Sequence, residues 1–205
     1  MSTVHKILKN ALKNMNYVGS GCYAAAFDSN KEIVKIGADI FDPYLYYLRE
    51  IKSLKNTHFP KFHSLYVDNY NEFYTVKLEK LYPLNDKQLK DYEQLYDWAV
   101  KGEDKPCWAS EELEEAVNKI VDLADVISLQ PLEDLEYEGQ AGDCRLDLHE
   151  ANVMSRSDGT LVFTDPLSDA QMFDAPAIEE WIDDYLYYTN KKYFYSCLLL
   201  ILIVL

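Results

Sequence analysis

One stretch of this sequence constrains its fold more than any other: the polar residues that interrupt short apolar runs between positions 145 and 168. Asp147 and Asn152 are five residues apart, and Asp165 follows Asn152 by thirteen residues. The apolar run at 160–164 predicts a strand that ends next to Asp165, and Ser-Asp-Gly at 157–159 predicts the turn before it. Residues 147–154 are then expected to form a loop.

These side chains match the needs of phosphoryl transfer. A carboxylate such as Asp147 can orient an acceptor hydroxyl and take its proton. An amide oxygen and a second carboxylate, from Asn152 and Asp165, can hold the divalent ions that neutralise phosphates. Asp and Asn also cap loops for purely structural reasons. Composition alone gives this combination in roughly one chain in 10⁴ of this length, so we predict a catalytic set.

The histidine between these residues does not by itself indicate a metal site. His149 lies two residues after Asp147, where it could orient Asp147 or Asp165. The other three histidines, at positions 5, 58 and 63, form no cluster with it, and a zinc site needs three or four ligands. No G-x-S-x-G or H-E-x-x-H pattern is present, so serine hydrolase and zincin functions have no support.

The first part of the chain adds a glycine-rich turn and a lysine. Gly19-Ser20-Gly21 precedes three alanines at 24–26 and an apolar run at 32–37, which together predict a hairpin. Lys35 lies inside that run, in the context typical of a nucleotide-binding lysine. We predict that the Gly-Ser-Gly turn covers phosphates and that Lys35 binds them. A lysine in a strand is otherwise a solvated residue at an edge.

Periodicity places the other elements. Strands are predicted at 23–27, 32–37, 62–67 and 72–78, and helices at 4–15, 44–54, 88–100, 111–129 and 177–188, with an irregular acidic segment at 132–142. Strands dominate up to residue 80 and helices dominate after it. This order indicates an α+β fold in two parts.

The loop and the second acidic turn resemble those of a known family. DLHEANVM and TDPLS are similar to the catalytic core of the early serine/threonine protein kinases of T-seven-like short-tailed bacteriophages (autographiviruses). That family carries a D-x-H-x-G-N-I-M loop and a T-D-P-[VL]-S motif. Its G-x-G hairpin, V-I-K-V strand and pre-hinge strand are similar to GSGCYAAAF, IVKIG and YTVKLE here. The resemblance covers roughly residues 15 to 170.

The resemblance implies a two-lobed protein-kinase-like fold in one kinase-like domain. A small β-rich N-lobe with one helix would span 1–80, a hinge would lie at 77–82, and a reduced, mostly helical C-lobe would span 81–205. The implied activity is that of an ATP- and Mg²⁺-dependent serine/threonine protein kinase. It would phosphorylate host proteins, and itself, in the host bacterial cytoplasm and so favour phage gene expression.

The resemblance also implies roles for single residues. Gly19, Ser20, Gly21 and Lys35 would contact the ATP phosphates, Asp147 would be the catalytic base, and Asn152 and Asp165 would bind Mg²⁺. Glu50, in the helix at 44–54, would either pair with Lys35 or be an exposed helix carboxylate. Glu79 and Leu81 would lie at the hinge, whose backbone meets the adenine.

Three departures from kinase patterns accompany the resemblance. Ala151 stands where the family usually has glycine, and Leu146 stands where regulated eukaryotic kinases have arginine, so a phosphate-gated activation loop is not expected. The 40 residues after Asp165 contain no clear A-P-E segment. The mode of protein-substrate binding is therefore left open.

Two alternatives to a protein kinase remain. The D-x-H-x-x-N and D-P pattern also resembles small-molecule phosphotransferases of the aminoglycoside and choline kinase type. Alternatively, the chain is an inactive kinase-like protein that inhibits a host factor by binding to it. Retention of Lys35, Asp147, Asn152 and Asp165 is an argument for turnover.

Charge and apolar content limit the partners. Residues 1–80 carry 11 basic and 8 acidic side chains, and residues 81–205 carry 9 and 27. The acidic second part disfavours nucleic acid and favours cations or basic partners. Four cysteines without a regular spacing predict free thiols, and the N-terminus lacks a signal-peptide core. The apolar end at 198–205 is shorter than the ~20 residues of a membrane span. The oligomeric state is not predicted.

Overall fold

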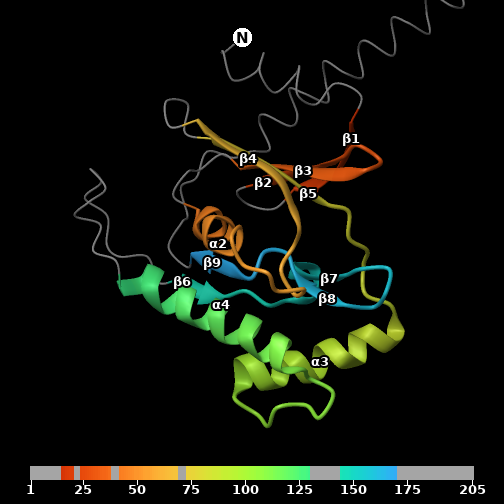
Figure 1. Ribbon diagram of the computed structural model, residues 1–205, viewed down its shortest axis with the longest axis vertical. Helices are drawn as coiled ribbons and strands as arrows, with labels where there is room; N and C mark the ends of the chain where they lie inside the picture. Colours follow the sequence, from red (N-terminus) through yellow and green to blue (C-terminus); the bar gives the residue numbers. More distant parts are fainter. Residues whose placement is uncertain (1–14, 21–23, 38–41, 69–72, 130–143, 170–205) are drawn as a thin grey trace, which may run out of the picture.

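The structure, a computed structural model, describes residues 15–20, 24–37, 42–68, 73–129 and 144–169. A five-stranded antiparallel sheet comprises β1 (Asn16–Ser20), β2 (Ala24–Asp28), β3 (Glu32–Gly37), β4 (Phe62–Asp68) and β5 (Phe73–Glu79). The strand order is β1-β2-β3-β5-β4. Figure 1 shows the sheet at the top, with the other labelled elements below it. The predicted helices at 4–15 and 177–188 and the apolar end lie outside the described residues.

The alternation of side chains along β3 determines where its lysine lies. Val34 and Ile36 are buried, and Lys35 between them lies on the opposite face, beside Val76 of the neighbouring strand β5. Val76 belongs to the core that includes the helix α2 (Pro43–Ile51). Lys35 is therefore on the face of the sheet that α2 covers.

The start of α2 follows from two signals in the sequence. Asp42 is its N-cap and Pro43 is its first residue, which are favoured choices at these positions. We predicted a helix at 44–54, but α2 ends at Ile51. The Leu54 N–H instead donates to the Ile51 carbonyl over 2.9 Å, and the Leu54 side chain stays exposed. Leu54 therefore lies in a turn, where its apolar side chain adds nothing to the core.

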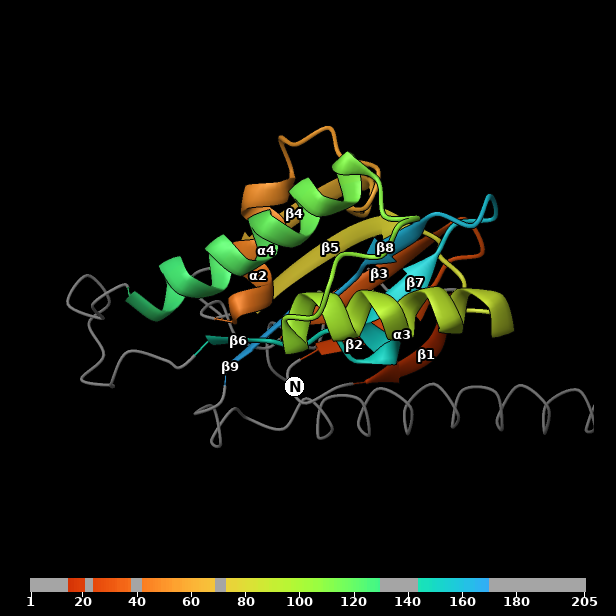
Figure 2. The ribbon, with the colours of Figure 1, turned by 90° about the horizontal axis from the view of Figure 1, so that it is seen from below.

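Two longer helices form the base of the molecule. Helix α3 (Asp86–Lys101) begins with a capping box between Asn85 and Gln88 and ends at Gly102, whose φ of 74° suits glycine. Helix α4 (Glu111–Leu129) spans the predicted residues. Figure 2, seen from below, shows α3 and α4 in front of the strands.

Short strands pair between these helices and the sheet. β6 (Cys144–Leu146) pairs with β9 (Leu167–Asp169), and β7 (Val153–Ser155) pairs with β8 (Leu161–Phe163), both antiparallel. The 3₁₀ turn η2 (Glu150–Asn152) precedes β7. The sequence predicted β8, within 160–164, because an apolar run follows the Ser-Asp-Gly turn. It did not predict β6, β7 or β9, and β7 begins at Val153, inside the segment 147–154 that was expected to be a loop.

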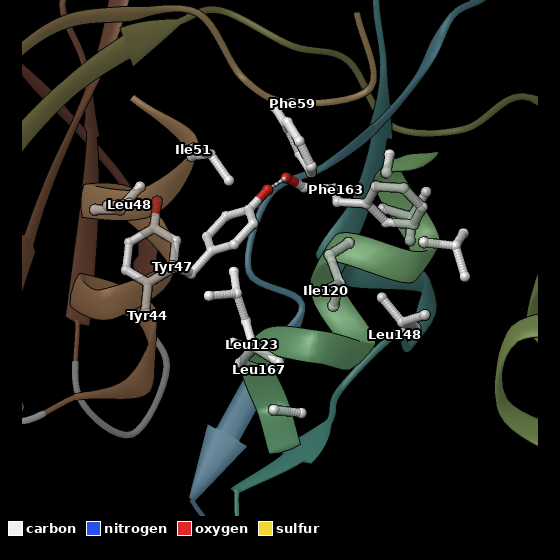
Figure 3. Close-up of a cluster of buried hydrophobic side chains, with 14 of the residues drawn as sticks. Tyr44, Tyr47, Leu48, Ile51, Phe59, Ile120, Leu123, Leu148, Phe163 and Leu167 are labelled. Carbon is white, nitrogen blue, oxygen red and sulfur yellow. Dashed lines mark hydrogen bonds between the residues drawn. The ribbon is translucent and has the colours of Figure 1, made fainter. Parts of the chain in front are cut away.

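One apolar core connects the two parts of the fold. Side chains of α2, α4, the short strands and β5 pack together in it, and Figure 3 shows the cluster around Tyr47 and Phe163. The Tyr47 hydroxyl donates to the Phe163 carbonyl over 2.6 Å. The fold is α+β, with a β-rich first part that carries α2 and, among the described residues after it, two long helices and four short strands, so the predicted α+β class is confirmed. The boundary between residues 80 and 81 stays a prediction.

Across the described ranges, we find no helix with the length and apolar character needed to cross a bilayer.

Candidate active site

Lys35 and Asp165 meet although 130 residues separate them in the chain. β3 directs Lys35 toward α2, and Asp165 lies where the chain turns from β8 to β9. The Lys35 ammonium donates a hydrogen bond to Asp165 Oδ2 and forms an ion pair with it. The two side chains keep 18% and 31% of their surface exposed, so a ligand can reach them. The fold thus places these two predicted residues in one site.

Backbone hydrogen bonds hold the predicted catalytic loop beside this pair. The Asp147 N–H donates to the Pro166 carbonyl over 2.8 Å, which fixes Asp147 next to the residue that follows Asp165. The side-chain amide nitrogen of Asn152, Nδ2, donates to the Asp147 carbonyl over 2.8 Å. Thr164 donates to the Asn152 carbonyl through both its N–H, at 2.8 Å, and its hydroxyl, at 2.9 Å. Asp147, Asn152 and Asp165 therefore lie on two loops that are bonded to each other.

His149 lies beside Asp147 rather than beside Asp165. Its Nδ1 accepts from the Ala151 N–H over 3.2 Å, so a neutral ring carries its proton on Nε2. Nε2 is 3.7 Å from Asp147 Oδ1, longer than a hydrogen bond but close enough for an electrostatic contact. Ala151 adopts no positive φ, so alanine fits without strain where the resembled family has glycine.

Residues at the start of α2 lie near Lys35. The Lys35 ammonium nitrogen is 3.7 Å from the centroid of the Tyr44 ring, a cation–π contact with a buried ring. Asp42 is 6% exposed; its carboxylate accepts from the Tyr44 N–H over 2.9 Å and from the Tyr74 hydroxyl over 2.8 Å. Burial, followed by the charge of Asp165, raises the pKa of Asp42 from 3.8 to about 6, although Lys35 and these hydrogen bonds oppose the rise.

Glu50 does not pair with Lys35. Helix α2 buries Leu48 and Ile51 against the core, and the helical period leaves Glu50 exposed. Its carboxylate instead accepts from Lys119 of α4 over 3.1 Å. Of the two expectations for this residue, the pair with Lys35 is wrong and the exposed helix carboxylate is what the structure shows.

The predicted phosphate-covering turn is described only in part. Gly19 and Ser20 end β1, where Ser20 accepts from the Tyr17 hydroxyl over 3.0 Å, and Gly21 lies outside the described residues. A Cβ at Gly19 would meet no atom within 4 Å. β1 and β2 pair on either side of this turn, which agrees with the predicted glycine-rich hairpin, although no strand was predicted at 16–20. The contact of this turn with phosphates stays a prediction.

The predicted hinge is fastened to the second part of the fold. Glu79 accepts from Arg156 in two places, and Tyr82 forms an antiparallel bridge with Ser155. Burial opposes ionisation of Glu79, but hydrogen bonds from Arg156 and from the Lys61 N–H outweigh it and hold the pKa of Glu79 below its ordinary value. The predicted role of Glu79 and Leu81 near adenine stays a prediction, and the Glu79 side chain is engaged elsewhere.

The donor set fits a magnesium ion held together with phosphates. Asn152 offers an amide oxygen and Asp165 a carboxylate, which are the hard oxygen ligands that Mg²⁺ prefers. In the described part of the chain, no group of three or more His, Cys, Asp or Glu side chains could hold a metal without help. Mg²⁺ commonly binds one or two protein ligands and completes its shell with water and phosphate oxygens.

Sequence reasoning missed two parts of this site. Asp42 was recognised only as a helix start, and nothing in a local pattern shows that its carboxylate lies near Lys35. Arg156 follows β7 and gave no signal, because its partners, Glu79 and the carbonyls of Thr57 and Phe59, come from distant segments.

Comparisons with known proteins add little to this geometry. No protein-family model matches the sequence, and no curated protein matches it. Two solved structures that are similar are variants of a thermostable aminoglycoside phosphotransferase, in ternary complexes with hygromycin B and either AMP-PNP or ADP. Each is 11% identical, with a TM-score of 0.29, and the match covers 64% of this chain and 40% of that one. A likeness this slight carries no argument about the chemistry of this chain.

Proposed function

We propose that this chain is a phosphotransferase that moves the γ-phosphoryl group of Mg-ATP to an acceptor hydroxyl. The observation that carries the proposal is the meeting of Lys35 with Asp165, next to the loop that holds Asp147 and Asn152. Phosphoryl transfer uses a lysine, two carboxylates and an amide oxygen. Here the lysine comes from β3, and the other three groups come from two loops that are hydrogen-bonded to each other.

Each residue has one role in this proposal. Lys35 binds phosphate oxygens, and Asn152 and Asp165 hold Mg²⁺, whose charge stabilises the triphosphate when it is bound. Asp147 accepts the proton of the acceptor hydroxyl as the acceptor oxygen bonds to the γ-phosphorus and the bond to ADP breaks. His149 lies beside Asp147, where its Nε2 makes an electrostatic contact with that carboxylate.

Two classes of acceptor are proposed. The first is a small cationic molecule of the aminoglycoside or choline type, in line with the 27 acidic and 9 basic residues after position 80. The second is serine or threonine in a host bacterial protein, as the resemblance of DLHEANVM and TDPLS to phage early kinases implies. The acidic charge suits a small cation and a basic protein segment alike, so the acceptor has to be identified by experiment.

One labelling experiment separates these classes. The purified chain is incubated with γ-labelled ATP and Mg²⁺, in one arm with a panel of aminoglycosides and choline and in another with a bacterial lysate. Label in a small molecule supports the first acceptor, and label in protein bands supports the second, if Asp147→Ala and Lys35→Ala abolish it. Transfer that is equally strong in both variants overturns the proposed site.

A binding measurement addresses the inactive alternative. Mg-ATP that binds the folded chain must raise its melting temperature, because ligand binding stabilises the folded state. A shift without transfer to any acceptor favours a binding protein that acts on a host factor by occupancy. No shift and no transfer overturns the phosphotransferase proposal altogether.

A further inference from the structure

We propose that Asp42 and Tyr44, in the first turn of α2, position Lys35 for nucleotide phosphates in place of a carboxylate from the middle of that helix. The inference rests on the proposed function of Lys35 as a phosphate ligand. It identifies two positioning residues that act through Lys35, and it makes Asp42 the second carboxylate of the lysine site.

The ring of Tyr44 is the first part of the device. The Lys35 ammonium nitrogen lies 3.7 Å from the centroid of the Tyr44 ring. Tyr44 is 1% exposed, so the core and the lysine together shield the ring from water. Cation–π contacts are strongest when they are desolvated in this way. The Tyr44 ring itself packs against Tyr47 and Tyr74, with centroids 6.1 and 6.2 Å away. The ring therefore cannot turn away from the lysine without disrupting the core.

Asp42 connects this ring to the strands of the sheet. Its carboxylate accepts from the Tyr44 N–H and from the Tyr74 hydroxyl of β5, so one side chain fixes α2 and the sheet together. Tyr74 in turn lies against β3 at Gly37, where a Cβ would come within 2.1 Å of the Tyr74 ring. Gly37 and Lys35 lie on the same face of β3, two residues apart. The network thus reaches the strand that carries the lysine.

A helix cap alone does not require this carboxylate to be charged. Asn or Ser would cap α2 equally well, and burying a carboxylate costs free energy. The charge of Asp42 interacts with Lys35 of β3, with Asp165 after β8 and with the buried hydroxyl groups of Tyr44 and Tyr74. A costly buried charge beside a functional lysine indicates a role beyond capping.

Asp165 has two proposed partners, Lys35 and a magnesium ion, which would compete for its carboxylate. Asp165 is both the ion-pair partner of Lys35 in this structure and one of the two proposed Mg²⁺ ligands. If Asp165 bound Mg²⁺, Lys35 would need another negatively charged group beside it. Glu50 cannot supply it, because its carboxylate bonds to Lys119 on α4. The face of Tyr44 contacts the lysine, and the charge of Asp42 interacts with it, so both could keep Lys35 in place without Asp165.

Asp42→Asn tests the charge while keeping the cap. Affinity for Mg-AMP-PNP is measured by calorimetry on the full chain, together with KM and kcat for ATP and the free energy of unfolding in urea. We expect the dissociation constant and KM to rise about tenfold, kcat to change less, and stability at pH 7 to be unchanged or higher. Asp104→Asn, in the exposed loop between α3 and α4, is the matched control and should match the wild type in all of them.

The ring is tested separately. Tyr44→Phe keeps the face that Lys35 covers and should bind nucleotide as the wild type does, while Tyr44→Leu should bind it several times more weakly. Equal affinity in Asp42→Asn, Tyr44→Leu and the wild type overturns this inference and leaves the proposed function standing. Lower stability of Asp42→Asn at unchanged affinity gives the Asp42 carboxylate a purely structural role and also overturns the inference. A wild-type chain that binds no nucleotide instead overturns the proposed function.

Discussion

Glu79 and Arg156 form a two-point contact across the fold. Arg156 Nε donates to Glu79 Oε2 over 3.0 Å, and Nη2 donates to Oε1 over 2.5 Å. The Arg156 side chain is only 12% exposed and that of Glu79 15%, and Arg156 also donates to the carbonyls of Thr57 and Phe59. One guanidinium therefore ties the end of β5, the turn after α2 and the β7–β8 hairpin together, directly beside the predicted hinge.

Arg156→Met should destabilise the protein by about 3 kcal/mol, because it leaves the largely buried Glu79 carboxylate without its partner. Arg156→Lys should recover little of this loss, since an ammonium cannot make the two parallel bonds of a guanidinium. Urea unfolding at pH 7 measures both variants. The double variant Arg156→Met/Glu79→Gln should be more stable than Arg156→Met alone. A cost below about 0.5 kcal/mol for Arg156→Met would show that the contact contributes nothing.

The same contact predicts a dependence of stability on pH. The pKa of Glu79 is lower in the folded state than its ordinary 4.5, so the folded state binds fewer protons than the unfolded state near and below that value. The stabilisation is complete above about pH 4.5 and is lost as the pH falls through the folded-state pKa. The stability advantage of the wild type over Glu79→Gln should therefore be constant from pH 7 to 5 and decline below. An advantage that grows in acid would contradict the ion pair.

Asp42 predicts the opposite trend. Its pKa is about 6 in the folded state against 3.8 for the free side chain, so the folded state binds more protons between these values. Wild-type stability relative to Asp42→Asn should then fall as the pH rises from about 4 to 6 and level off above, by about 3 kcal/mol in total. Urea titrations of both proteins at four pH values between 4 and 7.5 measure the difference. Parallel stability curves would mean that Asp42 ionises normally.

Glu50→Gln should have little effect on nucleotide binding or stability. The variant breaks an exposed ion pair with Lys119, and such pairs contribute about 0.5 kcal/mol or less. If Glu50 were instead the partner that holds Lys35, its loss would weaken Mg-ATP binding as strongly as a substitution of the lysine. Melting temperatures with and without Mg-ATP, compared for Glu50→Gln and Lys119→Gln, distinguish these two cases.

The sequence was most informative where a local pattern dictates the structure. The apolar run in Glu32–Gly37 and the helical period in Glu111–Leu129 predicted β3 and α4 at their observed bounds. The loop around Asp147 and the turn at Asp165 were likewise placed by short polar motifs. Contacts between distant segments could not be predicted this way. The partner of Glu50 depends on how α2 packs against α4, and the surroundings of Asp42 depend on β5 and β8.

Asp147→Asn should separate catalysis from structure. The main chain of Asp147 holds the loop, because its N–H donates to the Pro166 carbonyl and its own carbonyl accepts from the Asn152 side-chain amide. The Asp147 side chain takes no part in these bonds and is 37% exposed. Removing the charge should therefore leave the fold and nucleotide affinity intact.

The rate should respond very differently. Without the base that accepts the proton of the acceptor, kcat should fall by about 10² to 10⁴ while KM for ATP stays within a factor of about three. Steady-state kinetics with the acceptor identified by labelling measures both constants, and calorimetry with Mg-AMP-PNP checks that the site still binds. A fall in affinity without a fall in kcat would move Asp147 from proton transfer to nucleotide binding. The acceptor would then require another base, and His149, 3.7 Å away, would be the first residue to substitute.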